Sequence, residues 1–275
     1  MVSIKSKTMT LVFSDKVGIL KFKALDSIGY VNHAVSTRFG GVSVKDGLDT
    51  MNMGTFTSDE FDNVRSNYKI FCKAAGFDEK RVVLGYQTHS LNVRYVTECD
   101  CGKGVFVDRD YKDVDALITD CRNVPLVIHT ADCVPVSLID TKNRVIGCAH
   151  CGWRGTFGRL AEITLKAMQE KFSTRPENVI SLIGPCICQN CYEVSEDLFR
   201  DFEQKFGSNL YLKQSGNSYY IDLAGINKSV LNDAGVNENN IYVSDICTCC
   251  NTDLLYSHRG QGPKRGIFST FLEIV

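Results

Sequence analysis

The sequence predicts a mixed α/β protein in a single domain. Short runs of β-branched and aliphatic residues alternate with longer segments whose apolar residues recur every three or four positions. The runs at 124–130 and 134–139 are typical of buried strands, whereas 59–75 has the spacing of an amphipathic helix. No low-complexity segment or proline-rich linker divides the chain, so we expect one domain over residues 1–275.

The first half of the chain predicts two strands, one helix and a third strand. Strand-like segments at 11–13 and 18–22 lead into a glycine turn. Helix 59–75 follows, and Gly76 is its expected end because glycine readily adopts the left-handed conformation that closes many helices. The strand 82–84 comes next and runs towards Gln87 and His89.

The second half predicts a group of core strands and then further helices. Strands 124–130, 134–139 and 144–150 are followed by a turn at 152–155, where Thr156 is a candidate cap for a helix over 157–172. The elements expected after this helix are strand 179–183, helix 195–206, a hairpin over 211–223, helix 224–233, strand 241–243 and a closing segment from 256 to 271.

Composition narrows the class of protein. The hydrophobic fraction of 44% and the formal charge of −1 are ordinary for a globular protein. Basic residues are scattered, which argues against a nucleic-acid-binding surface. No stretch approaches the ~20 apolar residues of a membrane span. The polar start, Met1 to Thr10, lacks the apolar centre of a signal peptide, so we expect a cytoplasmic protein.

Thirteen cysteines require an explanation of their own. Their number is odd and the sequence shows no export signal, so we expect reduced thiols and not disulfides. Three CxxC words begin at Cys148, Cys188 and Cys247, but the first two are separated by far more than the roughly 15–20 residues of a zinc ribbon. We therefore expect these cysteines to pack as small buried residues, without a second metal site.

Three residues of metal-binding type stand near strand ends. His89 follows the strand 82–84, Cys133 lies between two strands, and His150 ends a third. Two imidazoles and one thiolate form the ligand set of a zinc site with an open fourth position. The same side chains would also serve a Cys/His nucleophile pair. Because they are 44 and 17 positions apart, only the fold can assemble them, which favours catalysis or binding over a local zinc finger.

Several uncommon words around these residues resemble one family. They are QTHS at 87–90, ADCVPV at 131–136, HCGWRGT at 150–156, IGPCI at 183–187, YEV at 192–194 and YSHR at 256–259. Together with TRFGGVS at 37–43 and MNMG at 51–54, they resemble the YfiH family, whose members have been labelled polyphenol oxidases or laccases. That family is associated with zinc-dependent purine nucleoside phosphorolysis, and the resemblance runs from about Asn32 to the carboxyl terminus.

The resemblance implies a fold and a metal site. It implies a YfiH-like domain with a layered α/β/β/α sandwich and mixed sheets, similar to the catalytic domain of cytotoxic necrotizing factor. It also implies that His89, Cys133 and His150 hold zinc and are the catalytic centre, with copper as an alternative metal. Cys151 departs from the small residue usual in the family and places a second thiol beside the site.

The same sequence motifs contain candidate residues for binding the substrate. Arg154 lies in a glycine-rich turn ahead of a predicted helix, where a guanidinium group suits phosphate, and Arg38 lies in a second glycine turn. Each arginine has a structural alternative, as a solvated turn residue or an ion-pair partner. Gln87 and Asn52 are candidates for binding a purine or ribose edge.

Other polar residues near the site have mainly structural expectations. Asp132 either accepts a hydrogen bond from a ligating histidine or caps its turn. His33 and His129 are expected to be structural, while His258 and Arg259 are expected to line the pocket.

Three functions of different classes follow. The resemblance favours phosphorolysis of adenosine, inosine and S-methyl-5′-thioadenosine, with adenosine deamination as a side activity. The expected partners are purine nucleosides and phosphate, without nucleic acid or membrane, and the sequence leaves the oligomeric state open. The second is a copper oxidoreductase acting on phenols, against which stand five histidines and the lack of a His-x-His pair. The third is a non-catalytic metal-binding protein, which a three-ligand set with an open position argues against.

Overall fold

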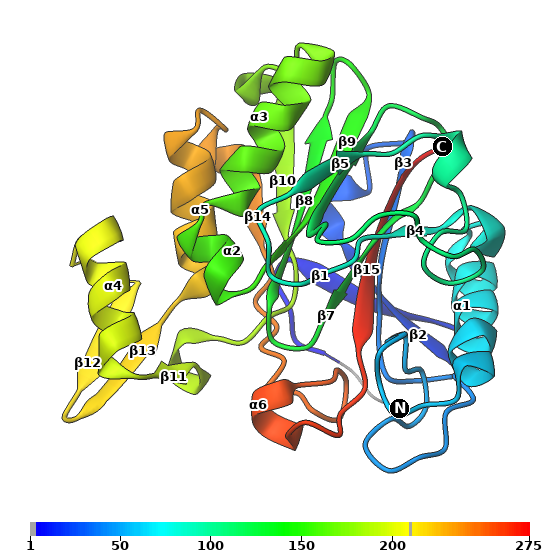
Figure 1. Cartoon of the computed structure of the whole chain (residues 1–275), viewed down its shortest axis with the longest axis horizontal. Helices are drawn as coiled ribbons and strands as arrows, with labels where there is room; N and C mark the ends of the chain where they lie inside the picture. Colours follow the sequence, from blue (N-terminus) through cyan, green and yellow to red (C-terminus); the bar gives the residue numbers. More distant parts are fainter. Residues whose placement is uncertain (1–3, 209–210) are drawn as a thin grey trace.

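Two six-stranded mixed sheets form the centre of the molecule in the computed structural model, which describes residues 4–208 and 211–275 (Figure 1). The first sheet contains β1 (Met9–Ser14), β2 (Val17–Phe22), β3 (Val31–Ser36), β4 (Val83–Leu84), β7 (Leu126–Thr130) and β15 (Phe268–Ile274). The second contains β5 (Val93–Tyr95), β6 (Ala116–Thr119), β8 (Val134–Asp140), β9 (Val145–Cys151), β10 (Val179–Ile183) and β14 (Ile241–Val243). Their orders are β1-β2-β3-β15-β7-β4 and β14-β10-β8-β9-β6-β5.

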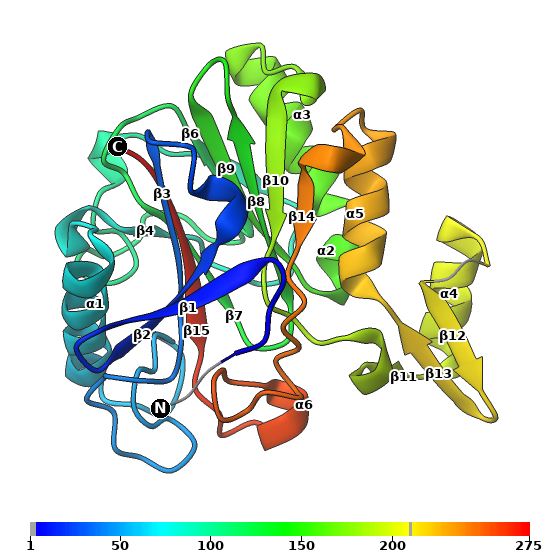
Figure 2. The ribbon, with the colours of Figure 1, turned by 180° about the vertical axis from the view of Figure 1, so that it is seen from behind.

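Helices cover the outer face of each sheet. The helix α1 (Phe61–Ala75) packs on the first sheet, and α2 (Trp153–Phe157), α3 (Leu160–Phe172) and α5 (Leu223–Asp233) pack on the second (Figures 1 and 2). Along β7, Leu126 and Ile128 belong to the core between the sheets, whereas Val127 faces α1. This alternation places apolar residues on both faces of the strand, because both are covered. The predicted α/β/β/α layering is confirmed.

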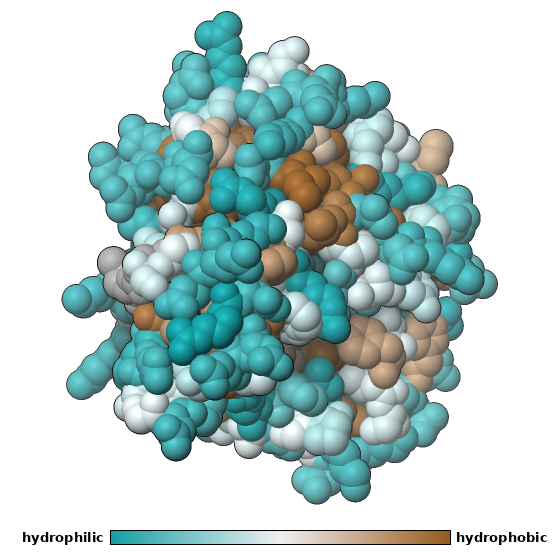
Figure 3. Space-filling model, turned by 60° about the vertical axis from the view of Figure 1, so that its left-hand side comes forward, coloured by the Kyte–Doolittle hydropathy of each residue, from teal (hydrophilic) through white to brown (hydrophobic). Residues whose placement is uncertain are grey.

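A smaller unit projects from the second sheet. It comprises β11 (Glu193–Val194), β12 (Leu212–Ser215) and β13 (Ser218–Ile221), with α4 (Glu196–Phe206) packed on them. The short helix α6 (His258–Gln261) lies in the segment between β14 and β15. Short 3-10 turns occur at Lys23–Leu25, Glu79–Arg81, Glu98–Asp100, Pro176–Asn178, Gln189–Cys191 and Glu238–Asn240. On the face shown in Figure 3 most of the surface is hydrophilic, and hydrophobic residues appear in separate areas.

Most predicted elements form where the sequence placed them. Gly76 ends α1 in the left-handed conformation, with φ of 80°. Ser195 caps α4, because its hydroxyl accepts a hydrogen bond from the Leu198 N–H at 3.4 Å. Among the helices of the described residues, none is long and apolar enough to cross a membrane.

The segment after His150 differs from its prediction. The expected turn is the short helix α2, and a break at Arg159, with φ of 60°, separates it from α3. Thr156 lies inside α2 and is not a cap: its hydroxyl donates to the Cys151 carbonyl at 3.2 Å. The hydroxyl thereby holds α2 against the end of β9.

The connection that carries Cys133 crosses between the sheets. The strand before it, β7, belongs to the first sheet, and the strand after it, β8, belongs to the second. Only residues 131–133 separate them. Cys133 therefore lies at the junction of the two layers, near the end of β9 that carries His150, since Val134 is paired with Cys151.

Candidate metal centre

The fold brings the three predicted ligand residues together. The ligand atoms of His89, Cys133 and His150 all lie within 4.8 Å of one another. The rings of the two histidines have centroids 4.8 Å apart. His89 comes from the loop after β4, Cys133 from the crossover between the sheets and His150 from the end of β9. Two imidazoles and one thiolate can bind zinc with a fourth position left over for an exchangeable ligand.

The two imidazoles experience opposite electrostatic environments. Burial and the neighbouring His150 lower the pKa of His89 to about 4. Burial also lowers the pKa of His150, but Cys133 and Asp115 outweigh it and raise the pKa to about 9. The surroundings therefore favour a proton on His150 and disfavour one on His89. A metal ion would displace the His150 proton, because only the unprotonated imidazole nitrogen is a ligand.

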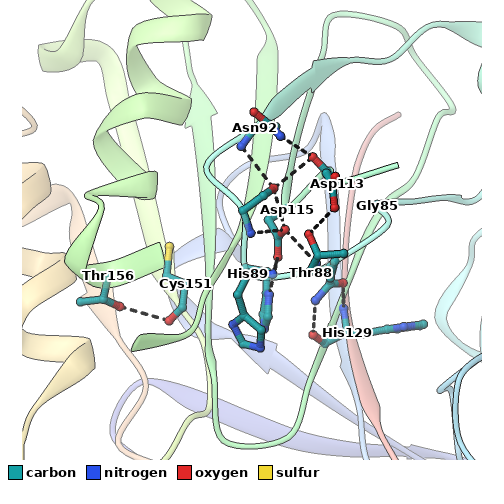
Figure 4. Close-up of polar contacts among 12 residues, drawn as sticks. Gly85, Thr88, His89, Asn92, Asp113, Asp115, His129, Cys151 and Thr156 are labelled. Carbon is teal, nitrogen blue, oxygen red and sulfur yellow. Dashed lines mark hydrogen bonds and ion pairs between the residues drawn. The ribbon is translucent and has the colours of Figure 1, made fainter. Parts of the chain in front are cut away.

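Asp115 organises the two histidines and was missed in the sequence. Its carboxylate, which is fully buried, contacts His150 Nδ1 at 2.8 Å and accepts a hydrogen bond from the His89 N–H at 3.1 Å (Figure 4). It also accepts from the N–H groups of Thr88, at 3.0 Å, and Ser90, at 2.8 Å. Contact with Asp115 leaves Nε2 as the His150 nitrogen available for a metal. The sequence signal for it was a carboxylate directly ahead of the apolar residues 116–118.

The space beside the ligands fits a metal ion. His89 Nδ1 is buried and has no hydrogen-bond partner among the described residues, whereas buried polar nitrogens are normally paired. A Cβ atom added to Gly152 would lie 2.6 Å from that nitrogen and 3.0 Å from the Cys133 sulfur. The glycine therefore keeps the ligand atoms accessible, and the donor set suits zinc. Their role as metal ligands remains a prediction.

Asp132 has a different role from the two that were considered. Its carboxylate accepts hydrogen bonds from the hydroxyls of Thr248, at 2.7 Å, and Ser257, at 2.6 Å. It also accepts from the Arg259 N–H at 2.6 Å. Asp132 therefore ties the Cys133 crossover to the carboxyl-terminal segment, while Asp115 is the carboxylate that contacts a candidate ligand histidine.

Arg154 and Gln87 both lie close to the centre. Arg154 is exposed on α2, stacks over the Trp153 ring at 4.1 Å, and has no carboxylate partner among the described residues. Its charge contributes to lowering the pKa of His89, after burial and His150. The Gln87 amide bonds the backbone of His129 at both ends, at 2.7 and 2.8 Å. Gln87 also lines a cavity of about 340 Å³ with His129.

The other two predicted substrate contacts are held by the protein itself. Arg38 forms an ion pair with Asp49 at 3.2 Å, bonds the Thr252 carbonyl and stacks over Tyr256 at 5.1 Å. Asn52 is fully buried, and both its amide atoms have protein partners. Every side-chain nitrogen of Arg38 and both amide atoms of Asn52 thus have a protein partner, so we do not include these residues among the proposed contacts.

The remaining histidines lie outside the cluster. His33 and His129 are buried, and burial lowers the pKa of each to about 3, which agrees with structural roles. His129 Nε2 contacts the Tyr68 hydroxyl at 2.7 Å. Arg259, from α6, stacks over the Tyr192 ring at 5.4 Å and donates to the Glu193 carbonyl at 2.9 Å.

Comparison with known proteins agrees with this architecture. Residues 32–274 match the family model described as multi-copper polyphenol oxidoreductase laccase. The purine nucleoside phosphorylase YlmD of Bacillus subtilis is 32% identical over 244 residues, which cover 86% of each chain. Adenosine deaminase RL5, from an unknown prokaryotic organism, is 30% identical over 85% of this chain and 90% of its own. The crystal structure of YlmD from Geobacillus stearothermophilus superimposes with a TM-score of 0.87 at 30% identity and covers 95% of this chain and 98% of that one.

Fold and site together define a layered α/β protein with a two-histidine, one-cysteine cluster at the junction of its sheets. The chain belongs to the multi-copper polyphenol oxidoreductase laccase family, which also confirms the resemblance found in its sequence.

Proposed function

We propose that this chain is a zinc-dependent purine nucleoside phosphorylase. It would cleave adenosine, inosine and S-methyl-5′-thioadenosine with phosphate, releasing the base and a sugar 1-phosphate, and would deaminate adenosine as a side activity. The observation that carries the proposal is the cluster of His89, Cys133 and His150, a ligand set that leaves one position for substrate or water. The similarity to relatives named purine nucleoside phosphorylase and adenosine deaminase supports the choice of reaction.

The proposed metal site consists of three ligand side chains and the carboxylate that orients two of them. His89, Cys133 and His150 would hold zinc, which when bound supplies a Lewis acid for a substrate oxygen or for water. Asp115 holds the Nδ1–H of His150 and fixes the ring, so that Nε2 remains directed away from the carboxylate. The Asp115 contacts with the backbone of Thr88 and Ser90 fix the His89 loop in the same way.

Arg154 is the proposed phosphate-binding residue. Its guanidinium is exposed beside His89 and is stacked on Trp153, so it is oriented without being neutralised by a carboxylate of the described residues. A planar guanidinium can form two parallel hydrogen bonds with a phosphate. Gln87 lines the neighbouring cavity, but both ends of its amide are bonded to the His129 backbone, so we propose it as a residue that shapes this wall of the cavity and not as a hydrogen-bonding contact.

The ligand types argue for zinc over a copper oxidase centre. A laccase uses several copper ions held mainly by imidazoles. Here the candidate site has two histidines. His33 and His129 are buried elsewhere in the protein and do not belong to the cluster of ligand atoms. The nucleoside reaction therefore fits the available side chains better than oxidation of phenols does.

The test is product analysis with and without phosphate. Purified protein would be incubated with adenosine, inosine or S-methyl-5′-thioadenosine, and the products separated by chromatography. We expect free base and sugar 1-phosphate only when phosphate is present, and loss of both after chelation, with recovery on adding zinc. Equal base release without phosphate would make the enzyme a hydrolase. Oxygen uptake with phenols, restored by copper and not by zinc, would favour the oxidoreductase.

A further inference from the structure

A second cluster of ligand-forming side chains lies apart from the candidate metal centre. The sulfur atoms of Cys188, Cys191, Cys247 and Cys250 all lie within 4.8 Å of one another. The sequence pairs them as two CxxC words, but 56 positions separate Cys191 from Cys247. Our expectation that these cysteines only fill space therefore has to be revised, because four thiols gathered at one point are a recurrent zinc-binding arrangement.

The topology explains how distant words come together. Strands β10 and β14 are parallel neighbours, with Ile183 paired with Val243. The chain leaves both strands at the same edge and runs on as two adjacent loops (Figures 1 and 2). Their backbones remain bridged beyond the strands, since the Thr248 N–H donates to the Cys186 carbonyl at 3.0 Å. The α4 unit and α5 fill the sequence between the two words.

The distances fit a tetrahedral ion better than a disulfide. Four sulfurs at about 2.3 Å from a zinc ion lie about 3.8 Å from one another. Cys191 and Cys250 have their sulfur atoms 3.4 Å apart, which is far longer than the ~2.05 Å of a disulfide bond. All four cysteines are free thiols. Small shifts of the side chains would bring the sulfurs to the distances that zinc requires.

The backbone around the cluster supports a bound thiolate. The Cys188 N–H donates to the Cys247 sulfur at 3.3 Å. Residues 189–191 form a single 3-10 turn, with Cys191 N–H bonded to the Cys188 carbonyl at 3.1 Å, which places both cysteines of the word on one side. The Cys188 N–H thereby stabilises the negative charge that the Cys247 sulfur would carry as a metal ligand.

We propose that Cys188, Cys191, Cys247 and Cys250 form a structural zinc site. Four thiolates close the coordination of zinc, so this site takes the ion without leaving a position for substrate. It joins the loop after β10 to the loop after β14, neither of which is held by a strand at this point. The ion is the ligand; no further cofactor is required.

The site would also stabilise one side of the candidate metal centre. Thr248, inside the second CxxC word, donates its hydroxyl to Asp132, the neighbour of Cys133. The Ile187 N–H, just before the first word, donates to the Asp132 carbonyl at 3.0 Å. Arg259 donates to the Cys191 carbonyl at 3.4 Å. Loss of zinc from the cluster would therefore loosen the loops that hold the Cys133 crossover.

The first experiment measures zinc per chain by mass spectrometry of the full-length protein purified under reducing conditions. We expect about two zinc ions in the wild type, and about one in Cys250→Ser and in Cys133→Ala. Cys249→Ser is the matched control, because this thiol is adjacent in sequence but outside the cluster; it should keep both ions. About one zinc in the wild type that is lost in Cys133→Ala and kept in Cys250→Ser would overturn the proposal.

A second measurement needs no substitution and covers the case in which Cys250→Ser does not fold. In the wild type loaded with zinc, the four cysteines should resist alkylation and become reactive when a chelator is added, whereas exposed Cys99 should react in both states. Alkylation of all four at the Cys99 rate before chelation would contradict the site. A Cys191–Cys250 disulfide in freshly reduced protein, or iron in place of zinc, would also overturn the assignment.

Discussion

The two clusters differ in ligand type and in how the protein holds them. The cluster of His89, Cys133 and His150 combines imidazole with thiolate at the junction of two sheets, and a buried carboxylate orients its histidines. The cysteine cluster has four ligands of one kind on two loops, held by backbone hydrogen bonds. Three ligands leave zinc a free position, whereas four thiolates complete its coordination.

The comparison separates two tasks that metal ions perform in proteins. A site for chemistry needs ligands fixed by a rigid environment, so that substrate and not the protein completes the coordination. A structural site needs only enough ligands to tie segments together. Substitutions in the mixed cluster should therefore reduce turnover with little effect on folding. Substitutions in the cysteine cluster should mainly reduce the stability of the fold.

The largest expected effect is at Cys133, the one thiolate of the mixed cluster. Cys133→Ala should abolish metal binding at the centre and turnover, while the fold stays largely intact because the residue lies in a connection and not in the middle of the core. Zinc content, phosphorolysis and circular dichroism would be measured together. Cys186→Ala and Cys249→Ala are the controls and should stay active. Full activity of metal-depleted Cys133→Ala would contradict the site assignment.

Gly152 tests the open space beside the ligands. Gly152→Ala places a methyl group 2.6 Å from His89 Nδ1 and 3.0 Å from the Cys133 sulfur. The backbone φ of −63° suits alanine, so the effect should arise at the site. A ligand displaced by about 1 Å costs about a hundredfold in rate. Gly29→Ala is the matched control, since nothing lies within 4 Å of its added Cβ. Turnover would be measured with excess zinc for both variants. Equal rates for Gly152→Ala and Gly29→Ala would contradict the close approach of Gly152 to the ligands.

Asp115 tests the rigidity of the mixed cluster. In the native protein both Asp115 carboxylate oxygens accept hydrogen bonds from N–H or O–H groups. In Asp115→Asn the amide NH₂ would face some of these donors, and those hydrogen bonds would be lost. Zinc affinity should fall about 10- to 100-fold. Asp113→Asn, two positions earlier, should bind zinc normally, because the Asp113 side chain bonds the Thr88 hydroxyl and no other group among the described residues. The zinc affinity would be measured by competition with a chelating dye. An unchanged affinity in Asp115→Asn would show that Asp115 does not support the metal ligands.

The smallest expected effect on the metal centre itself is at Arg154, for which no hydrogen bond to either cluster is found among the described residues. Arg154→Ala should raise the phosphate concentration required for half-maximal rate about ten- to a hundredfold, because a charge-assisted contact contributes roughly 1.5–3 kcal/mol. The apparent affinity for nucleoside should change much less. Arg200→Ala, an exposed arginine on α4 that pairs with Glu196 and Glu203, is the control. A shift in nucleoside affinity as large as that for phosphate would assign Arg154 to nucleoside binding instead.

Local sequence patterns predicted most secondary structure and the members of the mixed cluster. Helix α1 with its glycine end and the position of helix α4 depend on neighbours in sequence, which a pattern records directly, although the cap that Ser195 forms was not predicted. His89, Cys133 and His150 were recognised because each stands in an uncommon word near a strand end. The break at Arg159 was missed, since an arginine in the left-handed conformation between two helices has no signal in the local pattern.

The sequence by itself determined the class of fold and the chemical types of the ligands, since both depend on hydrophobic periodicity and on which side chains are present. Tertiary structure decided which of those side chains meet. Asp115 reaches both histidines only because β6 pairs with β9 in an antiparallel register. The two CxxC words meet only because β10 and β14 run parallel and release their loops at one edge. The spacing of nearby residues carries no information about which distant strands pair, so these contacts could not be predicted from a single sequence.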